Sequence, residues 1–197
     1  MDRDDGGAHR RRVENGYEVV SNTPGRRFTE KTVPVFPGTG SELFKQTEYE
    51  MEDIVTEFLH GHNTMSLATS RDNYPYAASL FYASDGLTLY FLSNPDSEHS
   101  LNISINPKVA VTISTDHADW RTVRGLQIMG RAREVREEEA ELARNVFEKK
   151  YPFLSELMGS DKLPRGAGHY AFFKVVPETI RFIDNGVYFG YRAEMLM

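Results

Sequence analysis

The stretch 63-NTMSLATSRDNYPYAASLFYASDGLTLYFLSN-94 decides the fold. Its runs 63–70, 76–83 and 87–93 are strand-like, because they are rich in aromatic, aliphatic and threonine side chains. The connections between these runs, RDNYP and SDG, are typical turn sequences. Since strands joined by short turns pair antiparallel, the stretch predicts three hairpin-linked strands of one antiparallel sheet.

Helices and further strands are predicted on both sides of this stretch. Before it, Thr47 and Glu50 have capping-box spacing, an apolar stripe recurs at helical intervals from Met51 to Leu59, and Gly61 suits a helix end. After it, the expected elements are a short helix capped by Ser97 over 97–105, strands over 108–114 and 121–135, a helix over 137–151, strands over 170–176 and 179–183, and the closing segment VYFGY over 187–191. Gly125 and Gly130, inside the long strand, indicate bulges or close backbone approach.

This order of elements predicts a mainly β (α+β) fold in which six or seven antiparallel strands form a small barrel with peripheral helices. The barrel domain is expected over 47–197 and an N-terminal extension over 1–46. The extension holds 6 of the 15 glycines and 3 of the 9 prolines. Two interpretations of it stay open: a flexible tail, or an ordered arm that binds a partner protein. The arm is favoured by the extension's apolar residues Val33, Val35, Phe36, Leu43 and Phe44.

Composition argues against several classes of function. The net charge of −6 makes nucleic acid an unexpected partner, because such binding depends on clustered lysine and arginine. The chain has no cysteine, which excludes disulfides, thiolate metal ligands and cysteine nucleophiles. No apolar run approaches the roughly 18 residues of a transmembrane helix, and no secretory signal pattern is present. We therefore expect a cytoplasmic protein without a membrane partner.

The histidines offer only weak metal or catalytic signals. His60 and His62 lie at a helix end, His117 precedes Asp119 in a loop, and His169 opens a strand. No third ligand accompanies any of them, so structural roles are favoured and no metal is expected. No Walker loop, GxGxxG or GxSxG motif occurs, and no residue stands out as a catalytic acid or base.

Three segments resemble the pyridoxamine 5′-phosphate oxidase-like FMN-binding split-barrel superfamily: NTMSLATS, PYAASLFYASDGLTLYFLSNPDSEHSLNISINPKVAVTIS and VRGLQIMGRAREV. The later segments RGLQIMG, ELARNVFEKKYP and TIRFIDNGVYFG are closest to the uncharacterised YhbP-like bacterial subgroup. The resemblance covers about residues 50–192. It implies a split barrel, a homodimer with cofactor sites at the dimer interface, and FMN as cofactor, with FAD, F420 and haem as alternatives within the superfamily.

The resemblance also implies site residues. Backbone groups of Ala78, Ser79 and Leu80 line the flavin ring. Arg124 and Gln127 approach from a later strand. The phosphate is held around the turn and short helix by Ser93, Asn94, Ser97 and His99.

The loop SNPDSEHS (93–100) has a physical basis for this role. If Ser97 begins the helix, the free N–H groups of the first turn attract a phosphate, and serine hydroxyls and His99 add donors. Glu98-His99 stands where the oxidases carry a basic pair, and the arginine of their second strand falls near Tyr76 or Ala77. A carboxylate beside a phosphate is unfavourable by about 1 kcal/mol.

The resemblance therefore implies an FMN-dependent oxidoreductase or reductase that acts on an unidentified small molecule. Pyridoxamine phosphate is not expected as the substrate, because the chain ends in YRAEMLM and lacks the arginine- and histidine-bearing end that grips it. The first alternative is a haem-binding or haem-degrading protein with His62, His99 or His169 as axial ligand. The second is a non-catalytic interaction subunit that docks through residues 1–46.

Overall fold

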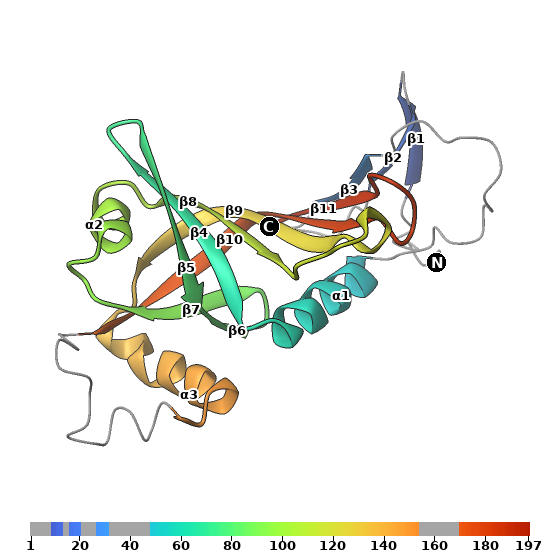
Figure 1. Cartoon of the computed structure of the whole chain (residues 1–197). Coiled ribbons are helices and arrows are strands. Elements are labelled where there is room, and N and C mark those ends of the chain that lie inside the picture. Colours follow the sequence, from blue (N-terminus) through green and yellow to red (C-terminus); the bar gives the residue numbers. More distant parts are fainter. Residues whose placement is uncertain (1–8, 14–15, 21–26, 32–47, 154–169) are drawn as a thin grey trace, which may run out of the picture.

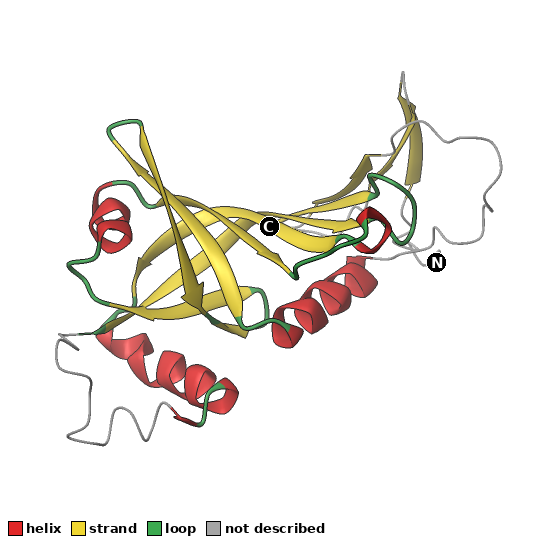
Figure 2. Ribbon diagram, viewed as in Figure 1, coloured by secondary structure: helices red, strands yellow, loops and turns green. Residues whose placement is uncertain are grey.

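The computed structural model describes residues 9–13, 16–20, 27–31, 48–153 and 170–197. An antiparallel sheet dominates it and curls into a half-barrel with three α-helices around it (Figures 1 and 2). The main path of the sheet runs β1-β2-β3-β11-β10-β9-β8-β4-β5, with the β6–β7 hairpin joined to β10. The predicted mainly β split barrel is confirmed, although eight of the described strands follow residue 63, against the six or seven expected.

The first two predicted strands form a hairpin. β4 (Thr64–Arg71) pairs with β5 (Tyr74–Phe81) through a two-residue turn. The turn residues Asp72 and Asn73 have φ angles of 52° and 63°. Both angles lie in the left-handed region that a tight hairpin turn requires.

The third predicted strand pairs elsewhere, which corrects the expected run of three hairpins. β6 (Ala83–Asp85) and β7 (Thr88–Ser93) form a separate hairpin, and β7 pairs with β10. The break falls at Tyr82, whose N–H donates to the Asn63 carbonyl and whose hydroxyl donates to the Leu59 carbonyl. These two bonds turn the chain away from β5 and open the barrel there.

The second half of the sheet consists of β8 (Lys108–Ser114), β9 (Arg124–Glu134), β10 (Ala171–Asp184) and β11 (Arg192–Leu196). β9 begins later than expected because Trp120–Thr122 forms a 3₁₀ turn, η1. The two strands expected over 170–183 are one continuous strand, β10. VYFGY forms a turn, and the last strand follows it.

The prediction for Gly130 is confirmed. A Cβ at this position would lie 2.3 Å from the Val176 carbonyl oxygen, so only glycine allows the two strands to approach. The β9–β10 register shifts directly beside it, between Pro177 and Thr179. Pro177 has no N–H to offer a ladder, which suits it to this bulge.

The core lies inside the half-barrel. Buried and exposed residues alternate along β4, β8 and β9, so each strand buries one face. Large side chains such as Leu67, Ile113 and Ile128 are at most 1% exposed, and burial of each contributes roughly 1.5–3 kcal/mol. α1 (Glu48–Gly61) adds the buried stripe of Met51, Val55 and Leu59. This helix confirms the predicted one, while Thr47 and the side chain of Glu50 lie outside the described residues.

The other helices cover separate parts of the sheet. α2 (Glu98–Ile105) closes one end of the half-barrel (Figure 1). α3 (Ala140–Lys150) follows the 3₁₀ turn η2 (Glu137–Glu139) and packs Phe147 with Tyr151 and Ala83. Among the described residues, no helix is long and apolar enough to cross a membrane.

Three strands in the N-terminal region lengthen the sheet. β1 (His9–Val13) pairs with β2 (Gly16–Val20), β2 pairs with β3 (Arg27–Lys31), and β3 pairs with β11. Binding of a partner protein through residues 1–46 stays a prediction.

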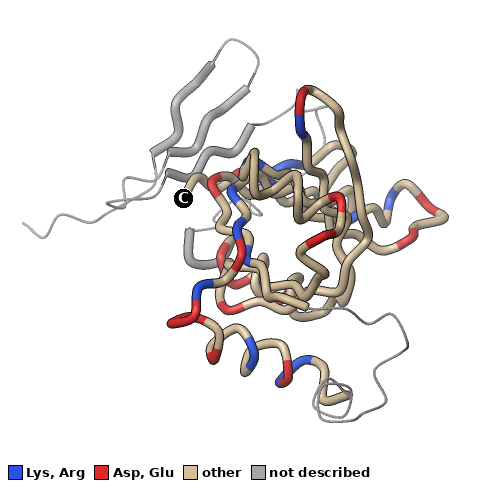
Figure 3. Tube along the Cα trace, turned by 90° about the vertical axis from the view of Figure 1, so that its left-hand side faces the viewer, with Lys and Arg blue, Asp and Glu red and all other residues tan. Residues whose placement is uncertain are grey.

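Figure 3 shows Lys and Arg interspersed with Asp and Glu along the coloured part of the trace.

Candidate functional site

The short helix α2 is fastened to the end of β4. Three consecutive β4 residues, Thr69, Ser70 and Arg71, contact side chains of α2 and its C-cap. Asn102 Nδ2 donates to Thr69 Oγ1 at 3.2 Å, and Asn106 Nδ2 donates to the Ser70 carbonyl at 3.1 Å. Arg71 forms an ion pair with Glu98 at 3.1 Å. These contacts hold α2 against the end of β4 along its length, with Glu98 at its start and Asn106 at its C-cap. The first turn of α2 is therefore a preformed surface.

A group of polar side chains, here called the α2 polar cluster, lies at this helix start and consists of Ser93, Ser97, His99 and Ser100. His99 Nε2 lies 2.7 Å from Ser93 Oγ and 3.0 Å from Ser97 Oγ. Ser97 Oγ also lies 2.8 Å from Ser100 Oγ. Ser93, His99 and Ser100 are all less than 8% exposed. The structure thus brings together three of the four residues predicted to hold a phosphate.

Ser97 occupies the N-cap position, but its side chain makes no cap hydrogen bond. The expected side-chain cap is therefore wrong, because the hydroxyl is engaged by the other members of the cluster. The N–H groups of the first turn keep their outward direction and partial positive charge. A helix start of this kind is suited to an anion.

His99 is the unusual member of the cluster. Its Nδ1 atom has no hydrogen-bond partner in the described part of the chain. Burial lowers the pKa of His99, so the ring is neutral at neutral pH. A buried polar atom without a hydrogen-bond partner lowers the free energy of unfolding by about 1–3 kcal/mol. Such atoms are rare, and they often occur where a ligand binds.

Asn94 shapes the loop. Its side-chain oxygen accepts a hydrogen bond from the Asp96 N–H at 2.8 Å, and its carbonyl accepts one from the Ser97 N–H at 3.0 Å. Both bonds tighten the turn that leads into α2. Asn94 therefore holds the backbone of the site in place.

Ala78, Ser79 and Leu80 lie on β5, the last strand on one side of the sheet. β5 forms a ladder with β4 alone among the described strands, so its other side presents unpaired backbone groups. Tyr76 on the same strand lies near His99, with ring centroids 6.3 Å apart. Ala78 follows Tyr76 by two residues, or about 7 Å of strand. The predicted ring-binding segment and the α2 polar cluster are thus neighbours.

Arg124 and Gln127 lie elsewhere on β9. Arg124 pairs with Asp184 at 2.7 Å and covers the ring of Phe182 at 5.2 Å. Ser93 of the cluster pairs with Ala171 at the start of β10, whereas Arg124 pairs with Asp184 at the end of that strand. Arg124 is therefore separated from the cluster by roughly 40 Å along β10. Gln127 is exposed on the outer face of the sheet. Within one chain, these two residues are not brought to the cluster.

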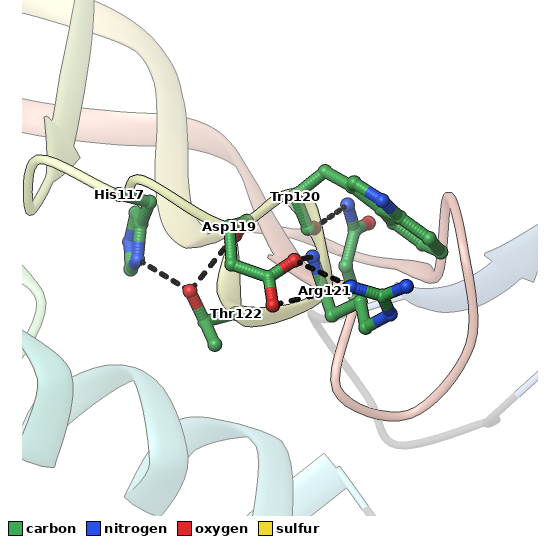
Figure 4. A network of polar contacts seen from close by, with 6 residues as sticks. His117, Asp119, Trp120, Arg121 and Thr122 are labelled. Atoms are coloured by element: carbon green, nitrogen blue, oxygen red, sulfur yellow. Dashed lines mark hydrogen bonds and ion pairs between the residues drawn. The ribbon is translucent and has the colours of Figure 1, made fainter.

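The loop pair His117 and Asp119 forms a structural network (Figure 4). His117 Nδ1 lies 3.3 Å from Thr122 Oγ1, and Asp119 Oδ1 accepts a hydrogen bond from the Arg121 N–H at 3.0 Å. These contacts shape the η1 turn before β9. Among the described residues, no group of three or more His, Cys, Asp or Glu side chains is arranged to hold a metal. His169 lies outside the described residues.

Two residues of the site were missed from the sequence. Arg71 meets Glu98 although 27 positions separate them, and no local pattern signals this contact. Ser100 belongs to the spacing Ser97-x-x-Ser100, which places two hydroxyls on one side of a helix and was a usable signal.

An antiparallel half-barrel closed by a short helix with a polar cluster at its start defines a split-barrel protein. The chain belongs to the pyridoxamine 5′-phosphate oxidase family, which it matches over residues 51–184. The UPF0306 protein YhbP of Escherichia coli O157:H7 is 22% identical over 138 residues, covering 69% of this chain and 86% of YhbP. The resemblance to the superfamily and to the YhbP-like subgroup is confirmed.

Solved structures share the fold. One from Listeria innocua, described as a candidate pyridoxamine 5′-phosphate oxidase, is 25% identical with a TM-score of 0.55 and covers 68% of this chain and 99% of its own. A FAD-binding protein from Mesorhizobium loti is 19% identical, with a TM-score of 0.53 and coverage of 77% and 96%. A heme binding protein from Mycobacterium smegmatis is 15% identical, with a TM-score of 0.56 and coverage of 72% and 56%.

Proposed function

We propose that this protein binds FMN and acts as a cytoplasmic FMN-dependent oxidoreductase on a small-molecule substrate. The observation that carries the proposal is the buried His99, whose Nδ1 has no partner among the described residues and lies beside the hydroxyls at the start of α2. The donor set fits a phosphate group: hydroxyls, an imidazole and the N–H groups of a helix start. FMN supplies the electron and hydride transfer chemistry when it is bound.

The residues of the chain have separate roles in this proposal. Ser93 and Ser97 donate hydroxyl hydrogen bonds to the phosphate. A bound dianion favours the imidazolium form of His99, which then donates from both ring nitrogens. Backbone groups at the unpaired edge of β5, from Ala78 to Leu80, orient the ring system.

A second copy of the chain completes the site in this proposal. The outer face of β4, β5, β8 and β9 carries uncharged side chains in two adjacent rows: Ser79, Ser66, Thr112 and Gln127 in one row, and Ala77, Ala68, Ala110 and Met129 in the next. All are exposed in the single chain. Two exposed rows without charged side chains suit the centre of a homodimer interface. Arg124 and Gln127 reach the flavin of the partner subunit across it.

The absorption spectrum of the purified protein tests the proposal. We expect the visible bands of bound flavin, or their recovery after FMN is added and excess is removed. A His99→Ala variant should retain less FMN, while the exposed control His60→Ala should retain as much as the wild type. A colourless protein that takes up no added FMN would refute the proposal.

Haem binding is a second candidate because of His62. Its Nδ1 lies 2.8 Å from the Phe58 carbonyl, and its ring stacks on Phe58 with centroids 4.0 Å apart. This bond orients the ring and leaves Nε2 without a hydrogen bond among the described residues, which is the state of an axial histidine. A Soret band on haem titration that disappears in His62→Ala would support haem over FMN. Absence of the band would remove this candidate.

A further inference from the structure

We propose that Arg71 is the cation that binds the flavin phosphate at the start of α2, and that Glu98 is the residue that positions it. This inference rests on the proposed function, since it names a further binding residue of the same site. The segment 93–97, SNPDS, contains no lysine or arginine and carries Asp96. Apart from His99 in its imidazolium form, the charge partner of a phosphate dianion in the α2 polar cluster therefore has to come from another element.

Arg71 is placed there by the hairpin geometry. It is the last residue of β4 and pairs in register with Tyr74 across the two-residue turn. Asp72 and Asn73 have left-handed backbone conformations, which fix the direction in which the chain reverses. The two preceding residues, Thr69 and Ser70, are themselves bonded to α2, so the base of Arg71 is held against the helix.

The contact with Glu98 brings the guanidinium to the first turn. Arg71 Nη2 donates to Glu98 Oε1 at 3.1 Å, and Glu98 is the first residue of α2, between Ser97 and His99. No other donor of the Arg71 guanidinium forms a hydrogen bond within the described ranges. The planar group therefore retains donors for a phosphate while one edge stays on the carboxylate.

The charges also balance in this arrangement. Glu98 alone would repel a phosphate, but its pairing with Arg71 cancels that repulsion. Both side chains are part-exposed, at 35% and 46%, so solvent weakens the ion pair and the guanidinium can turn towards a stronger anion. Glu98 thus holds the Arg71 guanidinium near the start of α2, where it can still bind a phosphate.

Paired titrations with FMN and riboflavin test the inference, because the two ligands differ only in the phosphate. For Arg71→Ala we expect FMN affinity to fall at least about tenfold, the usual loss for one charge-assisted hydrogen bond. Riboflavin affinity should stay within about twofold, as it lacks the group that Arg71 binds. Arg71→Lys should recover part of the FMN affinity, since it restores charge without the planar fork.

Arg144→Ala is the matched control. Arg144 also pairs with a glutamate, Glu148 at 4.0 Å, but lies on α3 away from the α2 polar cluster. Its removal should change neither titration. If the wild type prefers FMN over riboflavin and Arg71→Ala keeps that preference, the inference is overturned while the proposed function stands. If the wild type binds neither ligand, both are overturned.

Discussion

The ammonium of Lys150, at the end of α3, donates a hydrogen bond to the carbonyl of Leu59 in α1, 91 residues earlier, at 3.1 Å. The same ammonium donates to the His62 carbonyl and lies 4.2 Å from the centre of the Tyr82 ring. Lys150 thus serves carbonyls that the end of α1 leaves without helical partners. One side chain joins α3, α1 and the point where the barrel opens.

Replacement of Lys150 tests this junction. Lys150→Met keeps an unbranched side chain but removes one donor from the Leu59 carbonyl, which keeps the Tyr82 hydroxyl, and removes the Lys150 donor from the His62 carbonyl. We expect the free energy of unfolding to fall by about 1–3 kcal/mol, measured by urea denaturation. The exposed neighbour Lys149→Met should change it by less than about 0.5 kcal/mol. Equal effects of the two substitutions would show that the junction adds no stability.

Burial of His99 predicts a pH dependence of stability. Its pKa is lowered in the folded protein, so the unfolded chain binds the proton first as pH falls. The stabilising contribution is complete above the unfolded value of about 6.5 and declines below it. Thermal melts of the wild type and His99→Gln between about pH 5 and 7.5 should therefore converge as pH falls. Parallel curves would mean that His99 titrates as it does in the unfolded chain.

Gly130 predicts a severe packing defect. Alanine there would bring its Cβ against the backbone of Val176, which belongs to the central strand pair and cannot move aside easily. We expect Gly130→Ala to lower the free energy of unfolding by about 1–3 kcal/mol or more. Gly61→Ala is the control, because no atom lies within 4 Å of the added carbon. A Gly130→Ala protein as stable as wild type would contradict the close approach of β9 and β10.

Glu98→Gln separates repulsion from positioning. The substitution removes the negative charge at the start of α2 and releases Arg71. We expect FMN to bind several-fold more weakly, because the Arg71 guanidinium loses the carboxylate that holds it at the first turn, while the ion pair had already cancelled the repulsion of the phosphate. Riboflavin titration is the control and should not change. Tighter FMN binding would show that repulsion by Glu98 outweighs its positioning of Arg71.

Local sequence patterns predicted most helices and strands. They failed where an element depends on contacts between residues far apart in the chain. Turn residues located the β4–β5 hairpin, because a tight turn depends on neighbouring residues. Gly130 indicated a close approach, because a glycine inside a strand is itself a local signal, although the approaching residue, Val176, lies on β10. The departure at Tyr82 depends on carbonyls of Leu59 and Asn63, which belong to a helix end and a loop. The single strand β10 contains Pro177, which reads locally as a break but is accommodated at a bulge opposite Gly130.

The candidate site was predictable in part for the same reason. Ser93, Ser97 and His99 lie within one turn and helix start, so their proximity follows from sequence spacing. Ser97 was expected to cap the helix, but the buried His99 and Ser100 engage its hydroxyl instead. Arg71 reaches Glu98 only because Thr69 and Ser70 are docked on α2, a relationship between elements that no local spacing contains.

The late position of β10 constrains how the chain can fold during its synthesis. β7 has no ladder partner outside its own hairpin until β10 is present, and β11 joins both β10 and the early strand β3. A nascent chain that has emerged only as far as α3 therefore presents β7 with an open edge. The half-barrel closes after β10, which ends at Asp184, has emerged, so until then the chain stays exposed to chaperones and to mispairing.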